Sequence, residues 1–432
     1  MSNPLYKEIT KCRVCRSANL TPILSLGDLY VSNFFADAKA QEKNAVKAPL
    51  ELVLCNEKDG GCGLLQLKHS VDPEEMYRNY WYRSGINKSM TDELVGIVKK
   101  VEAIVPLSSG DFIIDIGSND GTLLRAYGGK GLNRIGFEPA RALAEKYGLE
   151  GITHVFTDFF SFSALHAKFG NAKAKIVTAI AMFYDLDDPN MFVGDIVKCM
   201  DDDGLLVVQM MYLPSFLKRN AFDGICHEHL EYYSLLSLEN LLKRHGLEVI
   251  DAEMREHVNE GSIRVYVRKV GMGKSLRLQP GASERVQAFR REEKALGLDD
   301  KRIYEEFVRR VLELKEMTIT SIKKEVAAGK TVFAYAASTK GNTTLQFFGL
   351  TPDLVTAIAD RNPDKWGTKT VGTMIPIISE EEFRNKKPDY VLILAWHFLP
   401  EFLKREADYL KAGGKFIVPM PEFKIIGGED LQ

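Results

Sequence analysis

The chain has 432 residues, of which 45% are hydrophobic and 27% charged, and its formal net charge is −2. This length is too great for one ordinary hydrophobic core and predicts two or three domains of a globular protein. A charge this close to zero disfavours duplex nucleic acid or an anionic membrane as the partner. We see no apolar run of about 20 residues, no secretory leader and too few cysteines for a disulfide scaffold, so we expect a cytoplasmic location.

Four of the six cysteines lie within the first 62 residues, in a C-x2-C pair and a C-x6-C pair. Two such thiolate pairs can hold one tetrahedral Zn²⁺, and four thiolates leave no open position for a substrate. The second pair is wider than usual, and the two glycines before its last cysteine would let the longer loop turn back on the metal. The alternative is four unrelated buried thiols. The sequence predicts a structural zinc site formed by Cys12, Cys15, Cys55 and Cys62.

Beyond this segment, strand-like and helical patterns alternate. Residues 72–109 have apolar positions at helical spacing, and "GDFIIDIGSNDGTLLRAY" predicts a strand, a glycine-bearing turn and the start of a helix. Further strand candidates separated by helical segments favour a mostly parallel sheet covered on both faces. Charged helical sequence over 284–328 leads to a second, smaller alternation. We predict an α/β protein with an N-terminal zinc-binding domain (1–72), a central domain (73–270), and a helical linker with a C-terminal α/β domain (271–432).

The turn after the first central strand, "DIGSNDG", differs from a dinucleotide-binding loop. Asn119 stands where the G-x-G-x-x-G pattern has its second glycine, and two carboxylates would repel a pyrophosphate. Carboxylates suit S-adenosylmethionine (SAM), which carries a sulfonium and an ammonium group. Glu138, at the end of the next strand, can accept both ribose hydroxyls, and Asp158, after the third, can accept the adenine amino group. The predicted SAM-binding residues are Asp115, Gly117, Asn119, Asp120, Gly121, Glu138 and Asp158.

A second unusual stretch is "FDGICHEHLEYYS", residues 222–234. In an extended segment His227 and His229 point the same way and Glu228 points opposite. From the residues alone, a proton-transfer site, a metal site and an ordinary buried loop all stay open. Tyr232 and Tyr233 are expected to be packing residues.

Over nearly its whole length the chain resembles a family of three-domain, SAM-dependent C-methyltransferases of nucleotide-linked deoxysugars. The resemblance is carried by the four-cysteine segment ending "CGLLQL" and by "DIGSNDGTLL", "CHEHLEYYS", "EGSIRVYV", "KGNTTLQ", "DRNPDKWG" and "PDYVLILAWHF". It implies a zinc-binding domain, a class I (Rossmann-like) SAM methyltransferase domain and a C-terminal Rossmann-like domain, with zinc purely structural. It also implies methylation at C3 of a 4-keto-6-deoxysugar linked to dTDP, bound between the last two domains.

By position, the resemblance makes His229 the general base that removes the sugar C3 proton, with Glu228 and Tyr82 as its neighbours. Proton abstraction next to a ketone needs a base whose pKa is near ambient pH, as histidine provides. Asp185 stands where family members carry a histidine, and it is a further catalytic candidate. Cys226 stands where they carry a tyrosine. These departures leave the acceptor, and the choice between carbon and oxygen methylation, open.

Three other side chains are candidate substrate contacts. His227 could bind substrate or be a buried, hydrogen-bonded histidine. Lys340 follows the strand "TVFAYA" and could bind a phosphate where a helix begins. Arg264 could pair a substrate phosphate, or equally a carboxylate of its own domain. The expected partner is a nucleotide-linked sugar, with no nucleic acid and no membrane, and the expected state is a monomer or small homo-oligomer.

Three rival functions are considered beside this one. The first is SAM-dependent methylation of an oxygen on another nucleotide sugar or small acceptor, which needs no enolate. The second is a zinc-ribbon module that binds nucleic acid, against which the near-neutral charge weighs. The third is a SAM-binding protein that has lost catalysis through the changes at Cys226 and Asp185.

Overall fold

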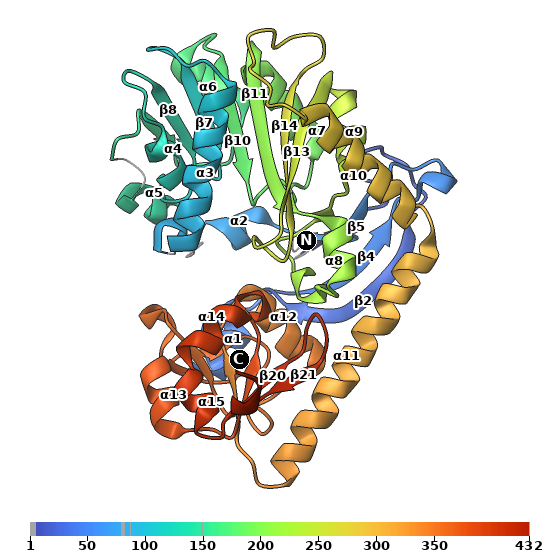
Figure 1. Cartoon of the computed structure of the whole chain (residues 1–432), viewed down its shortest axis with the longest axis vertical. Helices are drawn as coiled ribbons and strands as arrows, with labels where there is room; N and C mark the ends of the chain where they lie inside the picture. Colours follow the sequence, from blue (N-terminus) through green and yellow to red (C-terminus); the bar gives the residue numbers. More distant parts are fainter. Residues whose placement is uncertain (1–5, 79–82, 87, 148–149, 432) are drawn as a thin grey trace.

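The computed structural model describes residues 6–78, 83–86, 88–147 and 150–431. Figure 1 shows a large helix-covered sheet and a smaller α/β unit, with a curved antiparallel sheet from the N-terminal region between them and one long helix, α11 (Lys301–Ala327), along the side. Within the described ranges, none of the helices is long and apolar enough to cross a bilayer.

The central sheet has the order β13-β14-β11-β10-β7-β8-β9. Its first five strands in the chain run parallel, and β14 lies antiparallel to both of its neighbours. The strand bounds are β7 (Phe112–Ile116), β8 (Asn133–Phe137), β9 (His154–Phe156), β10 (Ala174–Ile180), β11 (Met200–Met211), β13 (Leu247–Arg255) and β14 (Ser262–Lys269). Chain order reverses between β7 and β10, and at such a switch point the carboxyl ends of parallel strands form a ligand-binding crevice.

Helices cover both faces of this sheet, as the alternation of patterns predicts. Most residues in the interior of the parallel strands are apolar because both faces of the sheet are buried. The helical segments are α3 (Lys88–Ile104), α4 (Thr122–Ala126), α5 (Arg141–Tyr147), α6 (Phe162–Phe169), α7 (Pro189–Cys199), α8 (Leu213–Lys218), the short η3 turn (Phe222–Gly224) and α9 (Leu235–Arg244).

The N-terminal region forms a curved sheet of order β12-β5-β4-β2, and its β12 comes from the central domain. The pairing Glu231↔Gln66 and Tyr232↔Leu65 therefore joins the segment after His229 to the cysteine-rich region. The elements are β1 (Tyr6–Glu8), β2 (Thr21–Tyr30), β3 (Phe34–Phe35), α1 (Ala38–Asn44), β4 (Lys47–Leu54), η1 (Glu57–Asp59), β5 (Leu65–Leu67), β6 (His69–Val71), α2 (Pro73–Tyr77), η2 (Ser84–Ile86) and β12 (Glu231–Tyr232).

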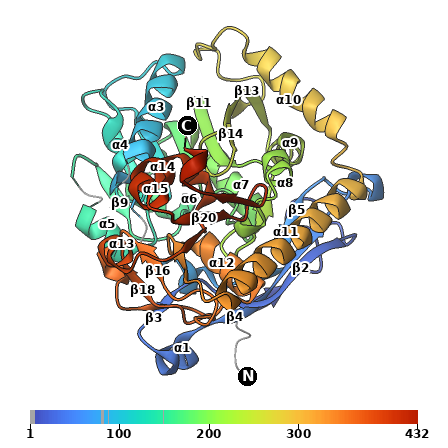
Figure 2. The ribbon, with the colours of Figure 1, turned by 60° about the horizontal axis from the view of Figure 1, so that its bottom comes forward.

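The C-terminal region is a second α/β unit, as predicted, with the sheet order β18-β16-β15-β19-β20-β21. Two helices, α10 (Ala282–Leu296) and α11, precede it in the expected linker, and Figure 2 shows α11 running along β2. The other elements are β15 (Val332–Tyr335), α12 (Thr339–Phe348), β16 (Ile358–Asp360), η4 (Pro363–Lys365), β17 (Lys369–Thr370), β18 (Ile377–Ser379), α13 (Glu380–Lys386), β19 (Tyr390–Ile393), η5 (Trp396–Phe398), α14 (Leu399–Arg405), α15 (Ala407–Lys411), β20 (Lys415–Val418), β21 (Lys424–Ile426) and η6 (Gly428–Asp430).

Candidate active site

The four N-terminal cysteines converge on one point. Their sulfur atoms all lie within 4.8 Å of one another, with Sγ–Sγ distances of 3.6 Å for Cys12–Cys62 and 3.4 Å for Cys15–Cys55. Zn–S bonds of about 2.3 Å in a tetrahedron place sulfurs about 3.8 Å apart, so the four thiols fit one zinc ion. A Cβ on Gly61 would lie 2.6 Å from the Cys55 Sγ, which explains the glycine in the wider loop.

The predicted SAM turn lies at the switch point of the central sheet. Gly117, Asn119 and Gly121 all have positive φ, at 71°, 53° and 76°. The Glu138 carboxylate, at the end of β8, accepts the main-chain N–H of Asn119 at 2.8 Å and that of Ala140 at 2.9 Å. The carboxyl ends of β7 and β8 are thereby tied together, with a buried acid between them.

Two further carboxylates of this turn are buried. Asp115 is 4% exposed and accepts a hydrogen bond from Thr178 Oγ1 at 2.5 Å. Burial, with the charge of Glu138 as a lesser cause, raises the pKa of Asp115 to about 7. Asp120 accepts the N–H of Gly85 at 2.9 Å, so the short η2 segment lies against the turn. Arg83 also pairs with Asp120, at 3.9 Å. The carboxylates of this glycine-bounded turn suit a cationic ligand such as SAM.

Asp158 lies after β9, but Arg78 already contacts it. The Arg78 guanidinium donates to Asp158 Oδ1 at 2.9 Å and to the carbonyl of Thr157 at 3.3 Å, and it also pairs with Glu74. The sequence reasoning did not single out Arg78. The sequence feature that points to Arg78 is its i, i+4 spacing from Glu74 on the predicted helix, which favours an ion pair between them.

The imidazole of His229 has a defined tautomer in this structure. Its Nδ1 lies 2.9 Å from the carbonyl oxygen of Gly224, which can only accept, so Nδ1 carries the proton and Nε2 keeps its lone pair. The Tyr184 ring packs edge-on at 4.5 Å. Burial, followed by the positive charge of Lys340, lowers the pKa of His229 to about 4. The ring is therefore neutral at pH 7.

Two carboxyl groups lie in the loop of His229 and in the segment that is bonded to it. The Tyr184 carbonyl accepts the N–H groups of Leu230 and Glu231, which brings Asp185 next to the loop of Glu228 and His229. Burial raises the pKa of both Asp185 and Glu228, and the charge of Glu228 raises that of Asp185 further. Among the described residues, Asp185 Oδ1 and Glu228 Oε2 are buried atoms without a hydrogen-bond partner.

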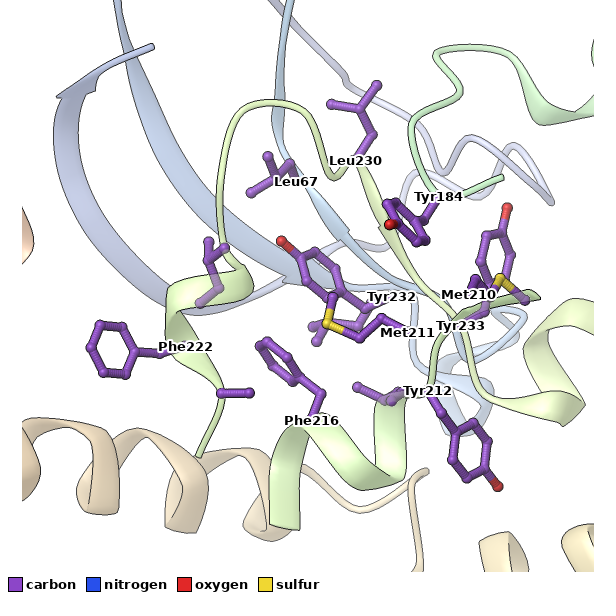
Figure 3. Packing of buried hydrophobic residues seen from close by; sticks show 14 of the residues in the cluster. Leu67, Tyr184, Met210, Met211, Tyr212, Phe216, Phe222, Leu230, Tyr232 and Tyr233 are labelled. Carbon is purple, nitrogen blue, oxygen red and sulfur yellow. The ribbon is translucent and has the colours of Figure 1, made fainter. Parts of the chain in front are cut away.

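Aromatic side chains surround this loop. Figure 3 shows Tyr232 and Phe216 packed together near η3, with ring centroids 5.1 Å apart. Tyr232 and Tyr233 are both buried, and the Tyr232 hydroxyl donates to the Gly224 carbonyl at 3.2 Å. Tyr82, the other expected neighbour of His229, lies outside the described residues.

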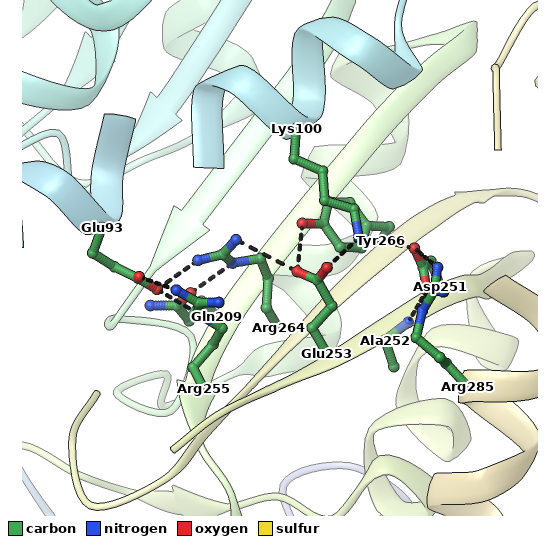
Figure 4. Close-up of polar contacts among 10 residues, drawn as sticks. All are labelled: Glu93, Lys100, Gln209, Asp251, Ala252, Glu253, Arg255, Arg264, Tyr266 and Arg285. Atoms are coloured by element: carbon green, nitrogen blue, oxygen red, sulfur yellow. Dashed lines mark hydrogen bonds and ion pairs between the residues drawn. The ribbon is translucent and has the colours of Figure 1, made fainter. Parts of the chain in front are cut away.

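The three candidate substrate contacts have partners within the protein. His227 Nε2 lies 3.0 Å from the carbonyl of Ala48, which matches the alternative of a buried, bonded histidine. Arg264 is buried in the network of Figure 4, where it donates to Gln209 at 2.7 Å and Glu93 at 2.5 Å. These contacts match pairing within its own domain.

Lys340 sits at the start of α12, next to the central domain. Its ammonium group pairs with the buried Glu260, whose other oxygen lies 2.7 Å from His397 Nδ1. The charge of Lys340 reaches His229, because it helps to lower the pKa of that imidazole. The C-terminal unit therefore contributes to the electrostatics around His229.

Comparisons with known proteins cover all three parts of the chain. Three family models match this chain. They describe a zinc binding domain over residues 12–77, a methyltransferase domain over residues 89–252 and a C-methyltransferase C-terminal domain over residues 257–421. The C-methyltransferase NovU of Streptomyces niveus is 30% identical over 425 residues, which cover 98% of this chain and 99% of that protein.

The chain belongs to the C-methyltransferase family. The C-methyltransferase is SAM-dependent, and its four-cysteine cluster is a structural zinc site, as the sequence predicts.

Solved structures similar to part of this C-methyltransferase include the mitomycin 7-O-methyltransferase MmcR and the plantazolicin methyltransferase BpumL in complex with SAH. MmcR is 19% identical over 43% of this chain and 55% of that chain, with a TM-score of 0.32. BpumL is 8% identical over 41% of this chain and 82% of that chain, also with a TM-score of 0.32. The fold assignment depends on the strand order and the matching family models.

Proposed function

We propose that this C-methyltransferase removes the C3 proton of a nucleotide-linked 4-keto-6-deoxysugar with His229 and methylates the resulting carbanion. The observation that carries the proposal is the state of His229. Its ring is neutral, and its Nδ1 proton is committed to the Gly224 carbonyl at 2.9 Å, so Nε2 is left as the proton acceptor. This is the state that a general base requires.

The low pKa of His229 is compatible with this role. A pKa of about 4 makes the imidazole a weak base before the reaction starts. As the proton leaves carbon, negative charge develops on the enolate next to the ring. That charge favours the imidazolium, so the pKa of His229 rises while the proton is transferred.

Asp185 and Glu228 fit the role of enolate stabilisers. Burial raises the pKa of both, and the charge of Glu228 raises that of Asp185 further, so Asp185 is the more readily protonated of the two. A protonated carboxyl group is a hydrogen-bond donor, and a donor fixed next to the keto oxygen stabilises the enolate without reorganisation. This would let Asp185 act at the position where the resembling family carries a histidine.

The methyl donor and the acceptor would meet at one edge of the central sheet. SAM, when bound, supplies an electrophilic methyl group. Asp115 and Asp120 would hold its cationic portion, and Glu138 would accept the ribose hydroxyls. His229 approaches the same edge because its loop is bonded to Tyr184, which follows β10, the neighbour of β7. Holding both reactants in register lowers the entropic barrier to transfer.

Hydrogen exchange at C3 tests the proposal. In deuterated water and without SAM, the wild-type enzyme should exchange the C3 hydrogen of a 4-keto-6-deoxysugar nucleotide, observed by NMR or mass spectrometry. His229→Ala should lower the exchange rate by roughly 100- to 10,000-fold. His166→Ala is a matched control, because His166 also bonds a carbonyl through Nδ1 (Gly170, 2.9 Å) but lies on α6.

The same experiment separates carbon from oxygen methylation. A sugar that the enzyme methylates without C3 exchange would identify oxygen as the nucleophile. Turnover of His229→Ala equal to that of wild type would remove the imidazole from the mechanism.

A further inference from the structure

The carbonyl group that fixes the tautomer of His229 belongs to the η3 turn. Gly224 ends this turn, and its oxygen accepts two hydrogen bonds, from His229 Nδ1 at 2.9 Å and from the Tyr232 hydroxyl at 3.2 Å. A carbonyl oxygen has two lone pairs, so both are used. The orientation of one peptide group therefore decides which imidazole nitrogen is protonated.

The C-terminal domain holds the two residues that precede this carbonyl. The Trp396 indole N–H, from η5, donates to Asp223 Oδ2 at 3.0 Å. The ring of Phe222 packs on Phe347 at 5.5 Å and on Phe348 at 5.3 Å, both at the end of α12. The η3 turn thus belongs to the central domain in sequence, but residues of the C-terminal domain contact it and hold it in place.

The bond between Trp396 and Asp223 is in a fully buried position. Asp223 has no exposed surface, Trp396 is 5% exposed, and among the described residues Asp223 Oδ1 has no hydrogen-bond partner. The indole N–H is therefore the one hydrogen bond shown for this carboxyl group in the described chain. Losing it would leave a buried polar group unsatisfied, which is costly enough to make the turn rearrange.

We propose that Trp396 and Asp223 are positioning residues that hold His229 as the Nδ1–H tautomer. Docking of the C-terminal domain would thus set the base as well as enclose the substrate. The proposal rests on the role of His229 as the base, given above. It predicts that a change in the C-terminal domain alters the protonation pattern of an imidazole in the central domain.

Trp396→Phe tests this in the full-length enzyme, because it removes the N–H and keeps an aromatic ring. The tautomer of His229 is read from long-range ¹H–¹⁵N spectra of ¹⁵N-histidine-labelled protein, with the signal assigned by its absence in His229→Ala. We expect the wild type to show Nδ1–H and Trp396→Phe to shift toward Nε2–H. C3 exchange should fall about tenfold, less than on removing the base.

Trp366→Phe is the matched control. Trp366 lies in the same domain, donates its indole N–H to the carbonyl of Asp360 at 2.8 Å and is 44% exposed. The same atom is removed, yet the tautomer and the exchange rate should stay at wild-type values.

Two variants change the acceptor of this hydrogen bond, Asp223, in case Trp396→Phe does not fold. Asp223→Asn keeps an oxygen that can accept from the indole and should retain the Nδ1–H tautomer, whereas Asp223→Ala should shift it as Trp396→Phe does. An unchanged tautomer in both Trp396→Phe and Asp223→Ala overturns the proposal. The spectra do not depend on turnover, so a wild type without C3 exchange would count against the role of His229 and leave the positioning result standing.

Discussion

Asp115 is a carboxyl group that burial holds near its titration midpoint at neutral pH. Its pKa of about 7 belongs to the ligand-free crevice. A cationic ligand favours the ionised form and lowers this pKa, so the complex binds fewer protons than the free enzyme. By linkage, SAM affinity must then rise with pH. For a pKa that falls from about 7 to below 5, the expected gain between pH 6 and pH 8 is about tenfold.

Isothermal titration calorimetry at several pH values, in buffers of different ionisation enthalpy, measures both the affinity and the proton release. Asp115→Asn serves as the reference, because the amino group of SAM titrates equally with both proteins. The variant should lack the extra pH dependence. Identical pH profiles for the wild type and Asp115→Asn would mean that no cationic group of the ligand lies near this carboxylate.

At the scale of elements, the cysteine-rich region and the segment after His229 contribute neighbouring strands to one sheet. β5 begins three residues after Cys62 and pairs with β12, which begins two residues after His229. Arg13, between the first two cysteines, is buried and donates to the carbonyl of Leu67 at 2.5 Å. Metal removal should therefore loosen β5 and β12 while the central parallel strands stay intact.

Hydrogen–deuterium exchange with and without a chelator tests this coupling. Amides of residues 65–67 and 231–232 should lose protection on zinc removal, and those of β7 and β10 should keep it. Cys62→Ser should show the same pattern with zinc lost, whereas Cys199→Ser, a buried cysteine outside the cluster, should retain about one zinc per chain. Unchanged protection of β12 without metal would contradict the coupling.

Elements that are fixed locally could be predicted from the sequence. Most residues in the interior of the central parallel strands are apolar and buried, and the turn after β7 carries its glycines where φ is positive. The cysteine quartet was visible from spacing alone. Two-residue strands such as β3 and β12 have no such signal, since their partners come from other domains.

Within the site, too, contacts between residues far apart in the chain could not be predicted from the sequence. The aromatic and acidic residue types around His229 were visible in the sequence, but the bond from Trp396 to Asp223 joins positions 173 residues apart. Arg264 was ambiguous because an arginine in a strand pairs a ligand or its own domain equally well. Only the network of Figure 4 assigns its present partners.

At the scale of the whole molecule, the N-terminal region is hydrogen-bonded to the C-terminal domain. The Gln346 side chain accepts the N–H of Tyr30 at 2.8 Å and donates to its carbonyl at 3.1 Å. Close by, β3 pairs with β17. Gln346→Leu should leave both main-chain groups of Tyr30 unpaired and lower the free energy of unfolding of the docked C-terminal domain by about 1–3 kcal/mol.

Urea unfolding followed by limited proteolysis measures this effect, with cleavage expected first between the central and C-terminal domains. Gln287→Leu, the same change at an exposed position of α10, should alter the unfolding free energy by less than about 0.5 kcal/mol. Equal effects of the two variants would mean that the hydrogen bonds between Tyr30 and Gln346 contribute nothing to the free energy of unfolding. The C-terminal domain would then be held by its contacts with the central domain, which include Trp396 with Asp223 and Asn220 with the carbonyl of Pro421 at 3.0 Å.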